Sequence, residues 1–469
     1  MAAVHFQSAL QMAASIRARE VSAVELLELH LARVKQHNPA INAVVIVDED
    51  RARARALQAD AALAKGGQHW GPLHGVPMTV KEAFDIEGLA TTFGYEDRRD
   101  NIPAKDALAV SRLKRAGAVI FGKTNVPVAL ADWQTFNPIY GTTNNPFDFE
   151  RSPGGSSGGS AAALATGLTA LEVGSDIRAS VRNLAHYCGV FGHKPTFGAL
   201  STKGHWVPPH DAMPELGIAV IGPLARSADD LALALDVLSG PDDVEAVGVR
   251  IALPSTEKRD PADFKIGIIY NDAIADVDEE VQGALRNLDG VLKDAGVTVH
   301  EGTRPPIDSV HGHDVYLRLL RAATSQYLPD DVVKHHLQMV KALSDGDDSY
   351  EAQMYRGTAM SNLEWLRLSE ERYRLRHIWA EWFEDYDLLL CPAATSVAFP
   401  HMQDGERWER MISVNGNPQP TTTPLPPGAS GLPTGVQIIG PQYRDHRCIA
   451  FAGLVEQLTG GFRAPSWCE

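Results

Sequence analysis

The stretch RSPGGSSGGSAAALATG, Arg151 to Gly167, decides how this chain is interpreted, because a run of glycine and serine passes directly into a run of alanine. A flexible linker stays polar, whereas this run continues into a small-residue helix suited to a packed interior. A phosphate-binding loop needs GxxxxGK[ST] or GxGxxG, and neither pattern occurs here. The remaining interpretation is a tight catalytic turn, in which glycines permit positive φ and present a serine hydroxyl.

A serine hydroxyl becomes a nucleophile at neutral pH only with a base within hydrogen-bond reach and donors for the oxyanion. Histidine is the usual base, and a serine–lysine pairing is the known alternative. The chain offers many candidates of both types, so the residue pattern alone leaves the base open.

Composition narrows the class of protein. The 469 residues carry 59 acidic and 43 basic side chains, a formal net charge of −16, and this balance argues against nucleic-acid or anionic-membrane partners. The four cysteines show no CxxC spacing, which favours a reducing compartment. The start of the chain does not resemble a signal peptide, and no apolar run is long enough to span a bilayer. We therefore expect a soluble cytoplasmic protein.

Short apolar strands alternate with helices along the chain. Strands are expected at 78–80, in AVIFGKTN, KIGIIY and VTVH, and late in DLLLCP and GVQIIGP. Helices are expected after a capping box at Ser22–Glu25, in RARARALQADAALA, and from Ser227 to Gly240. This order predicts an α/β fold with helices on both faces of a sheet. The stretches HGHD and KHHLQ lack metal-ligand spacing, so no metal site or cofactor is expected.

Several long motifs, in order along nearly the whole chain, resemble the amidase signature family. These motifs are GPLHGVPMTVKEAFDIEGLATTFG, VIFGKTN, GTTNNPFD, GGSSGGSAAALATG, GSDIRASVRNLAHYCGVFGHKPT, GPLARSADDLALALDVLSGPD and GLPTGVQIIGP. The resemblance implies one domain over 1–469, with a central mixed twisted β-sheet covered on both faces by α-helices. Within it we expect a helical N-terminal part (1–65), a catalytic core (66–240), a variable, largely helical substrate-side region (241–385), and a C-terminal return to the sheet (386–469).

The resemblance also implies a Ser–cis-Ser–Lys triad. Matched to the family, Lys81 is the base, Ser156 the serine with a cis peptide, and Ser180 the nucleophile. The two serines are separated by the family's usual 24 residues, and this interval excludes Ser175 and Ser160 as the matching serines. In this scheme a buried, neutral Lys81 accepts a proton through Ser156 as Ser180 attacks the carbonyl.

Further roles follow from the same match. Ser157 is expected to support the triad, and Asp176 and Arg182 to hold the nucleophile turn by an ion pair or backbone hydrogen bonds. The backbone N–H groups of Ile177, Arg178, Ala179 and Ser180 are expected to form the oxyanion hole.

The chain departs from the family at Arg178 and Ala179, where two glycines are usual. A non-glycine residue at positive φ costs about 1 kcal/mol and can misdirect the donors. Three outcomes remain open: Arg178 points to solvent or pairs with an acid, it lines the pocket and favours an electron-rich or anionic substrate, or it weakens the oxyanion hole.

The expected function is hydrolysis of amide-type bonds in small amides, anilides or carbamates, and also esters, through an acyl-enzyme. The alternatives are a glutaminase subunit of a tRNA-dependent amidotransferase and a weakly active or inactive relative. We expect a small-molecule substrate and leave a homodimer open.

Segments between the motifs are expected to shape the pocket: Ala131–Tyr140, Ser201–Gly217 and Val310–Trp365. Within them Trp133, Phe136, Tyr140 and Trp206 are the candidate aromatic lining.

Overall fold

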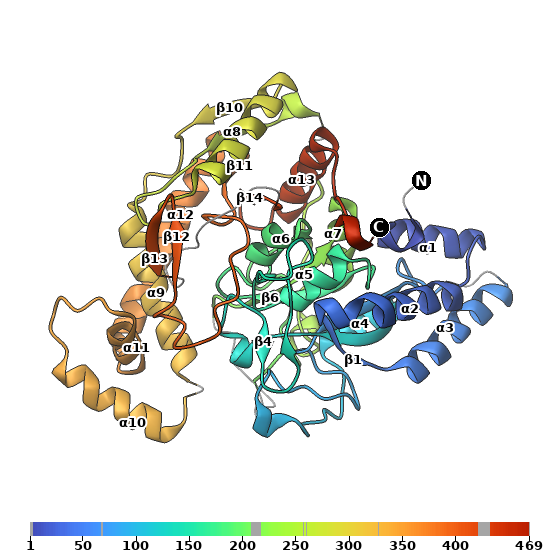
Figure 1. Ribbon diagram of the computed structural model, residues 1–469. Helices are drawn as coiled ribbons and strands as arrows, with labels where there is room; N and C mark the ends of the chain where they lie inside the picture. Colours follow the sequence, from blue (N-terminus) through green and yellow to red (C-terminus); the bar gives the residue numbers. More distant parts are fainter. Residues whose placement is uncertain are drawn as a thin grey trace.

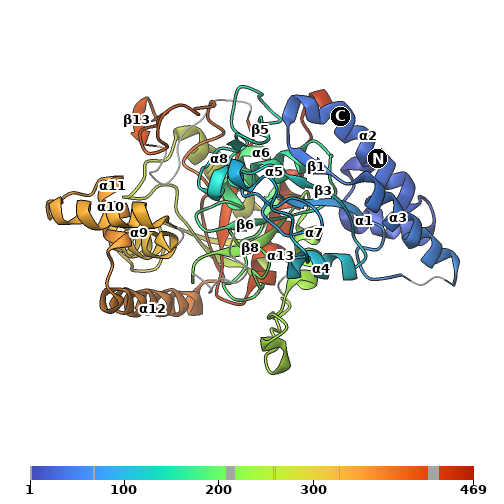
Figure 2. The ribbon, with the colours of Figure 1, turned by 90° about the horizontal axis from the view of Figure 1, so that it is seen from below.

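The computed structural model describes residues 3–66, 69–207, 217–256, 258, 260–326, 328–420 and 432–468. Figure 1 shows an N-terminal group of helices at one side, a central region of strands and helices, and a second helical group at the other side. Both termini lie near the N-terminal helices in both ribbon views (Figures 1 and 2).

The N-terminal helices follow their sequence signals. Helix α1 spans Ala9–Ala18, α2 spans Ala23–Ile41 and α3 spans Glu49–Ala64. The predicted capping box is confirmed at the start of α2, where the Ser22 hydroxyl accepts from the Glu25 backbone and the Glu25 carboxylate accepts from Ser22. The face of α2 that carries Leu27 and Leu31 is buried against the core.

The strands that belong to the central region form three hydrogen-bonded segments. The first contains β1 (Val44–Val47), β3 (Val119–Thr124) and β2 (Pro77–Lys81), and β3 is antiparallel to β1 and parallel to β2. The second contains β6 (Glu172–Asp176), β8 (Val220–Ala225) and β7 (Phe191–Gly192), all antiparallel. The sheet is thus mixed, as expected from the sequence, and β2 and β6 carry residues of the candidate site.

The third segment joins parts of the chain that are distant in sequence. It runs in the order β10 (Thr298–Glu301), β9 (Lys265–Ile268), β11 (Leu388–Pro392) and β14 (Val436–Ile439), parallel except for the last pair. The region 241–385 therefore supplies two strands to the sheet that the C-terminal part completes. Two short hairpins complete the strands, β4 (Phe136–Asn137) with β5 (Gly141–Thr142), and β12 (Met411–Val414) with β13 (Asn417–Pro420).

Helices pack around these segments because each has an apolar stripe to bury. Those nearest the strands are α4 (Leu108–Arg115), α5 (Gly158–Ala165), α6 (Arg182–Cys188), α7 (Ala228–Leu238), α8 (Glu279–Asp294) and α13 (Asp445–Thr459). Helix α5 is buried along its whole length, which its glycine and alanine residues make sterically feasible.

The second helical group consists of α9 (Ser309–Ser325), α10 (Asp330–Met339), α11 (Tyr350–Thr358) and α12 (Asn362–Asp385). Figure 2 shows it at the end of the molecule opposite the N-terminal helices. Its own small core contains Val315, Leu319 and Leu368. None of the helices that the structure describes is long and apolar enough to cross a bilayer.

Candidate active site

The glycine–serine stretch is a buried turn that leads into α5. Residues 152–165 are all buried, and Gly154 has a φ of +89° that favours glycine. A Cβ atom on Gly155 would lie 2.5 Å from the carbonyl oxygen of Asp132. This close packing excludes the linker interpretation. The peptide bond between Gly155 and Ser156 is cis.

Lys81 is the last residue of β2 and reaches two serine hydroxyls. Its Nζ donates to Ser156 Oγ at 2.7 Å and to Ser175 Oγ at 2.9 Å. Both serines are at most 8% exposed and Lys81 is fully buried. A neutral amine has one lone pair, so it can accept a proton from one of these hydroxyls while still donating to the other.

Burial gives Lys81 the properties of a base. Loss of hydration lowers the Lys81 pKa from 10.5 to about 7, against the opposing influence of the carboxylates of Asp176, Glu172 and Glu82. All three carboxylates are buried, and burial raises the pKa of Glu172 to about 8. At neutral pH the Lys81 amine is therefore substantially uncharged.

The turn after β6 carries Ser180, which is 4% exposed. Asp176 holds this turn: its Oδ1 accepts from the Ala179 amide at 2.8 Å and its Oδ2 accepts from the Val181 amide at 3.1 Å. Arg182 donates to both oxygens of Asp176, at 2.9 Å and 3.0 Å. Burial alone would raise the pKa of Asp176, but the charge and hydrogen bonds of Arg182 bring it below its usual range.

The expectation that the Ala179 N–H belongs to the oxyanion hole is not met in this structure. Because this N–H donates to Asp176, it is not available to a substrate oxygen. Ala179 adopts a φ of +70° in this turn. Ile177, Arg178 and Ser180 stay as the predicted donors.

Two aromatic side chains fix the peptide planes of this turn. Tyr316 of α9 donates its hydroxyl hydrogen to Ile177 O at 3.1 Å, and Trp133 Nε1 donates to Arg178 O at 3.1 Å. In a trans peptide the C=O and the following N–H point in opposite directions. The Tyr316 bond therefore fixes the direction of the Arg178 N–H, one of the predicted oxyanion donors.

A cavity of about 350 Å³ brings the candidate residues together. Ser156, Ser175 and Ser180 line it, with Trp133, Arg178 and Trp206 among the predicted residues. The guanidinium of Arg178 lies 4.7 Å from the centroid of the Trp133 ring, and burial lowers the pKa of Arg178 to about 10. Arg178 thus belongs to the cavity wall.

Two predicted aromatic residues lie elsewhere. Among the described residues, neither Phe136 nor Tyr140 lines this cavity. Phe136 belongs to the β4–β5 hairpin, where its ring faces the guanidinium of Arg410 at 5.7 Å. Tyr140 lies at the tip of that hairpin, where its carbonyl oxygen accepts from Asn42 Nδ2 at 2.7 Å. Of the stretch Ser201–Gly217, residues 208–216 lie outside the described residues.

Ser157 supports the site indirectly. Its hydroxyl lies 3.4 Å from both the backbone N–H and the backbone oxygen of Ser175. It therefore steadies the strand that carries Ser175.

No sequence motif predicts several of the residues that form the site. Spacing excludes Ser175 from the triad, yet its hydroxyl contacts Lys81. His205 lines the cavity between the rings of Phe84 and Phe93, and burial, with the charge of Lys81, lowers its pKa to about 3. Further cavity residues come from the second helical group and the segment before β12: Leu320, Arg321, Thr324, Leu328, Tyr350, Met354 and Arg407. Their contribution depends on tertiary packing.

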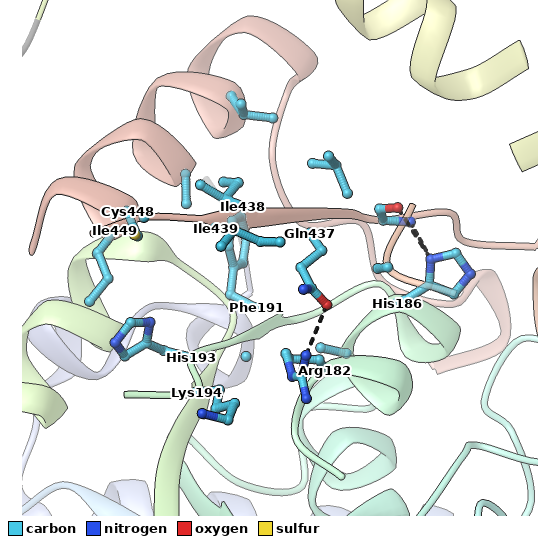
Figure 3. A pocket seen from close by; sticks show the side chains of 18 of the residues that line it. Arg182, His186, Phe191, His193, Lys194, Gln437, Ile438, Ile439, Cys448 and Ile449 are labelled. Carbon is cyan, nitrogen blue, oxygen red and sulfur yellow. Dashed lines mark hydrogen bonds between the residues drawn. The ribbon is translucent and has the colours of Figure 1, made fainter. Parts of the chain in front are cut away.

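A second, larger cavity of about 1500 Å³ lies between β14 and α13 on one side and α6 and β7 on the other. Figure 3 shows Arg182 at its edge, where Nη1 donates to Gln437 Oε1 at 3.1 Å, and His186 beside the chain before β14. None of Lys81, Ser156 and Ser180 lines it. Arg182 thus connects the nucleophile turn to β14, but the serine–lysine chemistry belongs to the smaller cavity. The described residues contain no cluster of three or more His, Cys, Asp or Glu side chains suited to a metal.

The family model described as Amidase matches residues 25–449. The chain belongs to the amidase family. It is an amidohydrolase that acts on carbon–nitrogen bonds.

Relatives of this amidase have several recorded activities. It is 32% identical to the indoleacetamide hydrolase of Bradyrhizobium diazoefficiens, with 98% of this chain and 88% of that protein covered. It is 30% identical to a component of the glutamyl-tRNA(Gln) amidotransferase of Roseiflexus sp., with 94% of each chain covered. The solved structure of 6-aminohexanoate cyclic dimer hydrolase with its substrate superposes with a TM-score of 0.78, at 26% identity over 100% of both chains. These likenesses establish the fold and the amidase class.

Proposed function

We propose that this amidase hydrolyses small amides, anilides or carbamates, and also esters, through an acyl-enzyme on Ser180. Lys81 takes the Ser180 proton by way of Ser156 as the hydroxyl oxygen attacks the carbonyl carbon. The same relay returns the proton to the leaving amine when the carbon–nitrogen bond breaks. Water then attacks the acyl-enzyme and passes a proton through Ser156 to Lys81, and the relay returns that proton to Ser180 Oγ as the acyl–oxygen bond breaks and the acid leaves.

One observation carries this proposal. The buried amine of Lys81, with a pKa near 7, lies 2.7 Å from Ser156 Oγ, and Ser156 and Ser180 line the same cavity. A lysine in solution at this pH would be almost fully protonated and unable to act as a base. The amides of Ile177, Arg178 and Ser180 are the proposed donors to the oxyanion.

The likeness to an indoleacetamide hydrolase supports hydrolysis of an amide. The test is a panel of primary amides, 4-nitroanilides, carbamates and 4-nitrophenyl esters, with Ser180→Ala as the inactive control. Hydrolysis of one class or more by the parent enzyme, lost in Ser180→Ala, supports the proposal. Turnover that survives in Ser180→Ala contradicts it.

A glutaminase component of an amidotransferase is the second candidate, because the amidotransferase relative aligns over 94% of both chains. Glutamine hydrolysis that rises when a partner protein is added would identify it. A weakly active or inactive relative is the third candidate, and inertness toward a serine-directed fluorophosphonate would identify an inactive one. We also propose that the enzyme is cytoplasmic, because Cys188, Cys391 and Cys448 form no disulfide. A homodimer is a further proposal, and light scattering tests it.

A further inference from the structure

The wall of the active-site cavity contains three guanidinium groups. Arg178 comes from the nucleophile turn, Arg321 from α9 and Arg407 from the segment before β12. They lie close enough to act on one another: burial lowers the pKa of Arg178 and of Arg321, and the positive charges of their neighbours lower them further. The three side chains therefore place guanidinium groups along one part of the cavity wall.

Arg321 is the most informative of the three. It is only 6% exposed, and its buried Nε has no hydrogen-bond partner in the part of the chain that the structure describes. Its guanidinium lies 4.2 Å from the centroid of the Tyr350 ring and also interacts with the Tyr350 hydroxyl, so its neighbour is a phenol rather than a carboxylate. Arg321 thus lines the cavity beside an aromatic ring.

A neighbour on the same helix shows the contrast. Arg318 lies one turn earlier on α9, and its guanidinium bonds to the carboxylates of Glu364 and Asp314 at the surface. Arg321 has no carboxylate partner among the described residues. On the same helix, Arg318 lies outside the cavity and has acidic partners, whereas Arg321 lines the cavity and has none among the described residues.

The described part of the cavity wall also contains carboxylates, and each has an arginine partner of its own. Among the described lining residues these are Asp132 and Asp176. Asp132 pairs with Arg410 at 2.7 Å and Asp176 with Arg182, and neither of those arginines lines the cavity.

We infer that this amidase takes an amide that carries a carboxylate on one half of the molecule, and that Arg321 binds that carboxylate. The inference rests on the proposed function, and it narrows the substrate class. A guanidinium edge matches the geometry of a carboxylate, and such charge-assisted pairs are the stronger hydrogen bonds of protein sites. The carboxylate belongs either to the acyl half or to the amine half of the substrate, and a separate pair of test compounds examines each half.

The test compares matched anionic and neutral substrates. For the acyl half, glutaryl-4-nitroanilide is compared with pentanoyl-4-nitroanilide. For the amine half, 4-acetamidobenzoate is compared with 4-acetamidotoluene. In one of the two pairs the anionic compound is expected to have a kcat/KM about tenfold or more above its neutral partner. Arg321→Met is expected to abolish that ratio, and Arg318→Met, the same change one turn away, is expected to retain it.

A binding measurement decides the inference without turnover. Calorimetry on the Ser180→Ala protein gives the Kd of each compound, and the anionic member of one pair is expected to bind about tenfold or more tightly. If the parent enzyme hydrolyses no compound, the proposed function fails, but this comparison still tests Arg321. Equal Kd values within both pairs, or a preference that persists in Arg321→Met, overturn the inference. If Arg321→Met does not fold, the comparison in Ser180→Ala alone decides it.

Discussion

The rate of amide hydrolysis is expected to rise with pH along the titration of Lys81. Burial lowers the pKa of this amine from 10.5 to about 7. At such a pKa the neutral fraction is roughly 1% at pH 5, roughly 10% at pH 6 and roughly 90% at pH 8. For an unperturbed lysine the neutral fraction at pH 7 would be only about 0.03%, so nearly all of the rate would lie above about pH 9. The position of the rise therefore tests burial of Lys81 as the source of its reactivity.

The assay measures kcat/KM for one amide substrate from about pH 5 to about pH 9 at constant ionic strength, because this parameter reports groups in the free enzyme. Enzyme held at each pH is assayed again at pH 8 to separate titration from unfolding. The expected curve is a single step of about tenfold per pH unit below the midpoint, levelling off above about pH 8. Lys81→Met is expected to lose this activity.

Lys123 provides the matched control. It is also fully buried, and burial lowers its pKa to about 8, but its Nζ donates to Ala90 O and Thr91 Oγ1 rather than to a serine. Lys123→Met is expected to leave the midpoint where it is. A rate that does not change between about pH 5.5 and pH 8.5, or a midpoint that moves in Lys123→Met, would refute the assignment of Lys81 as the base.

Three further predictions concern the turn that carries Ser180. Tyr316→Phe removes the hydroxyl that orients the Arg178 amide. Because one hydrogen bond is lost, kcat is expected to fall about three- to tenfold, with little change in Tm. An unchanged kcat would argue against this positioning role. Ala179→Gly relieves a Cβ at a φ of +70° and is expected to stabilise the fold by about 0.5–1 kcal/mol in denaturant unfolding; a lower midpoint would contradict this. Asp176→Asn leaves the partly buried Arg182 charge without its partner, so unfolding should require about 3–5 kcal/mol less free energy, and unchanged stability would exclude Asp176 as the residue that holds the turn.

The strands and helices with strong local signals were predictable from the sequence. The capping box of Ser22 and Glu25 fixes the start of α2, and the apolar runs KIGIIY and DLLLCP form β9 and β11. Local patterns could not predict that these two strands pair, because the strands lie more than a hundred residues apart and meet only in the tertiary fold.

The site divides in the same way. Lys81 and Ser156 lie in motifs, and the structure brings them into contact. The sequence leaves a positive φ at Ala179 open. It does not show that the Ala179 N–H donates to Asp176, because that hydrogen bond depends on the path of the whole turn. Phe136 is a pocket candidate from the sequence because aromatic residues often line pockets, yet the hairpin faces its ring toward Arg410. Asp314, four residues before Arg318, is a local signal for an ion pair that Arg321 lacks, but the burial of Arg321 in the cavity wall depends on the packing of α9.

The most direct test of the central claim is to locate the covalent adduct formed with a fluorophosphonate. The enzyme is treated near pH 8, digested, and analysed by tandem mass spectrometry, with Lys81→Met treated in parallel. We predict one phosphonylated serine, Ser180, and much slower labelling when Lys81 is replaced. An adduct on Ser156 or Ser175 instead, or labelling of Ser180 at the same rate in Lys81→Met, would contradict the proposed triad.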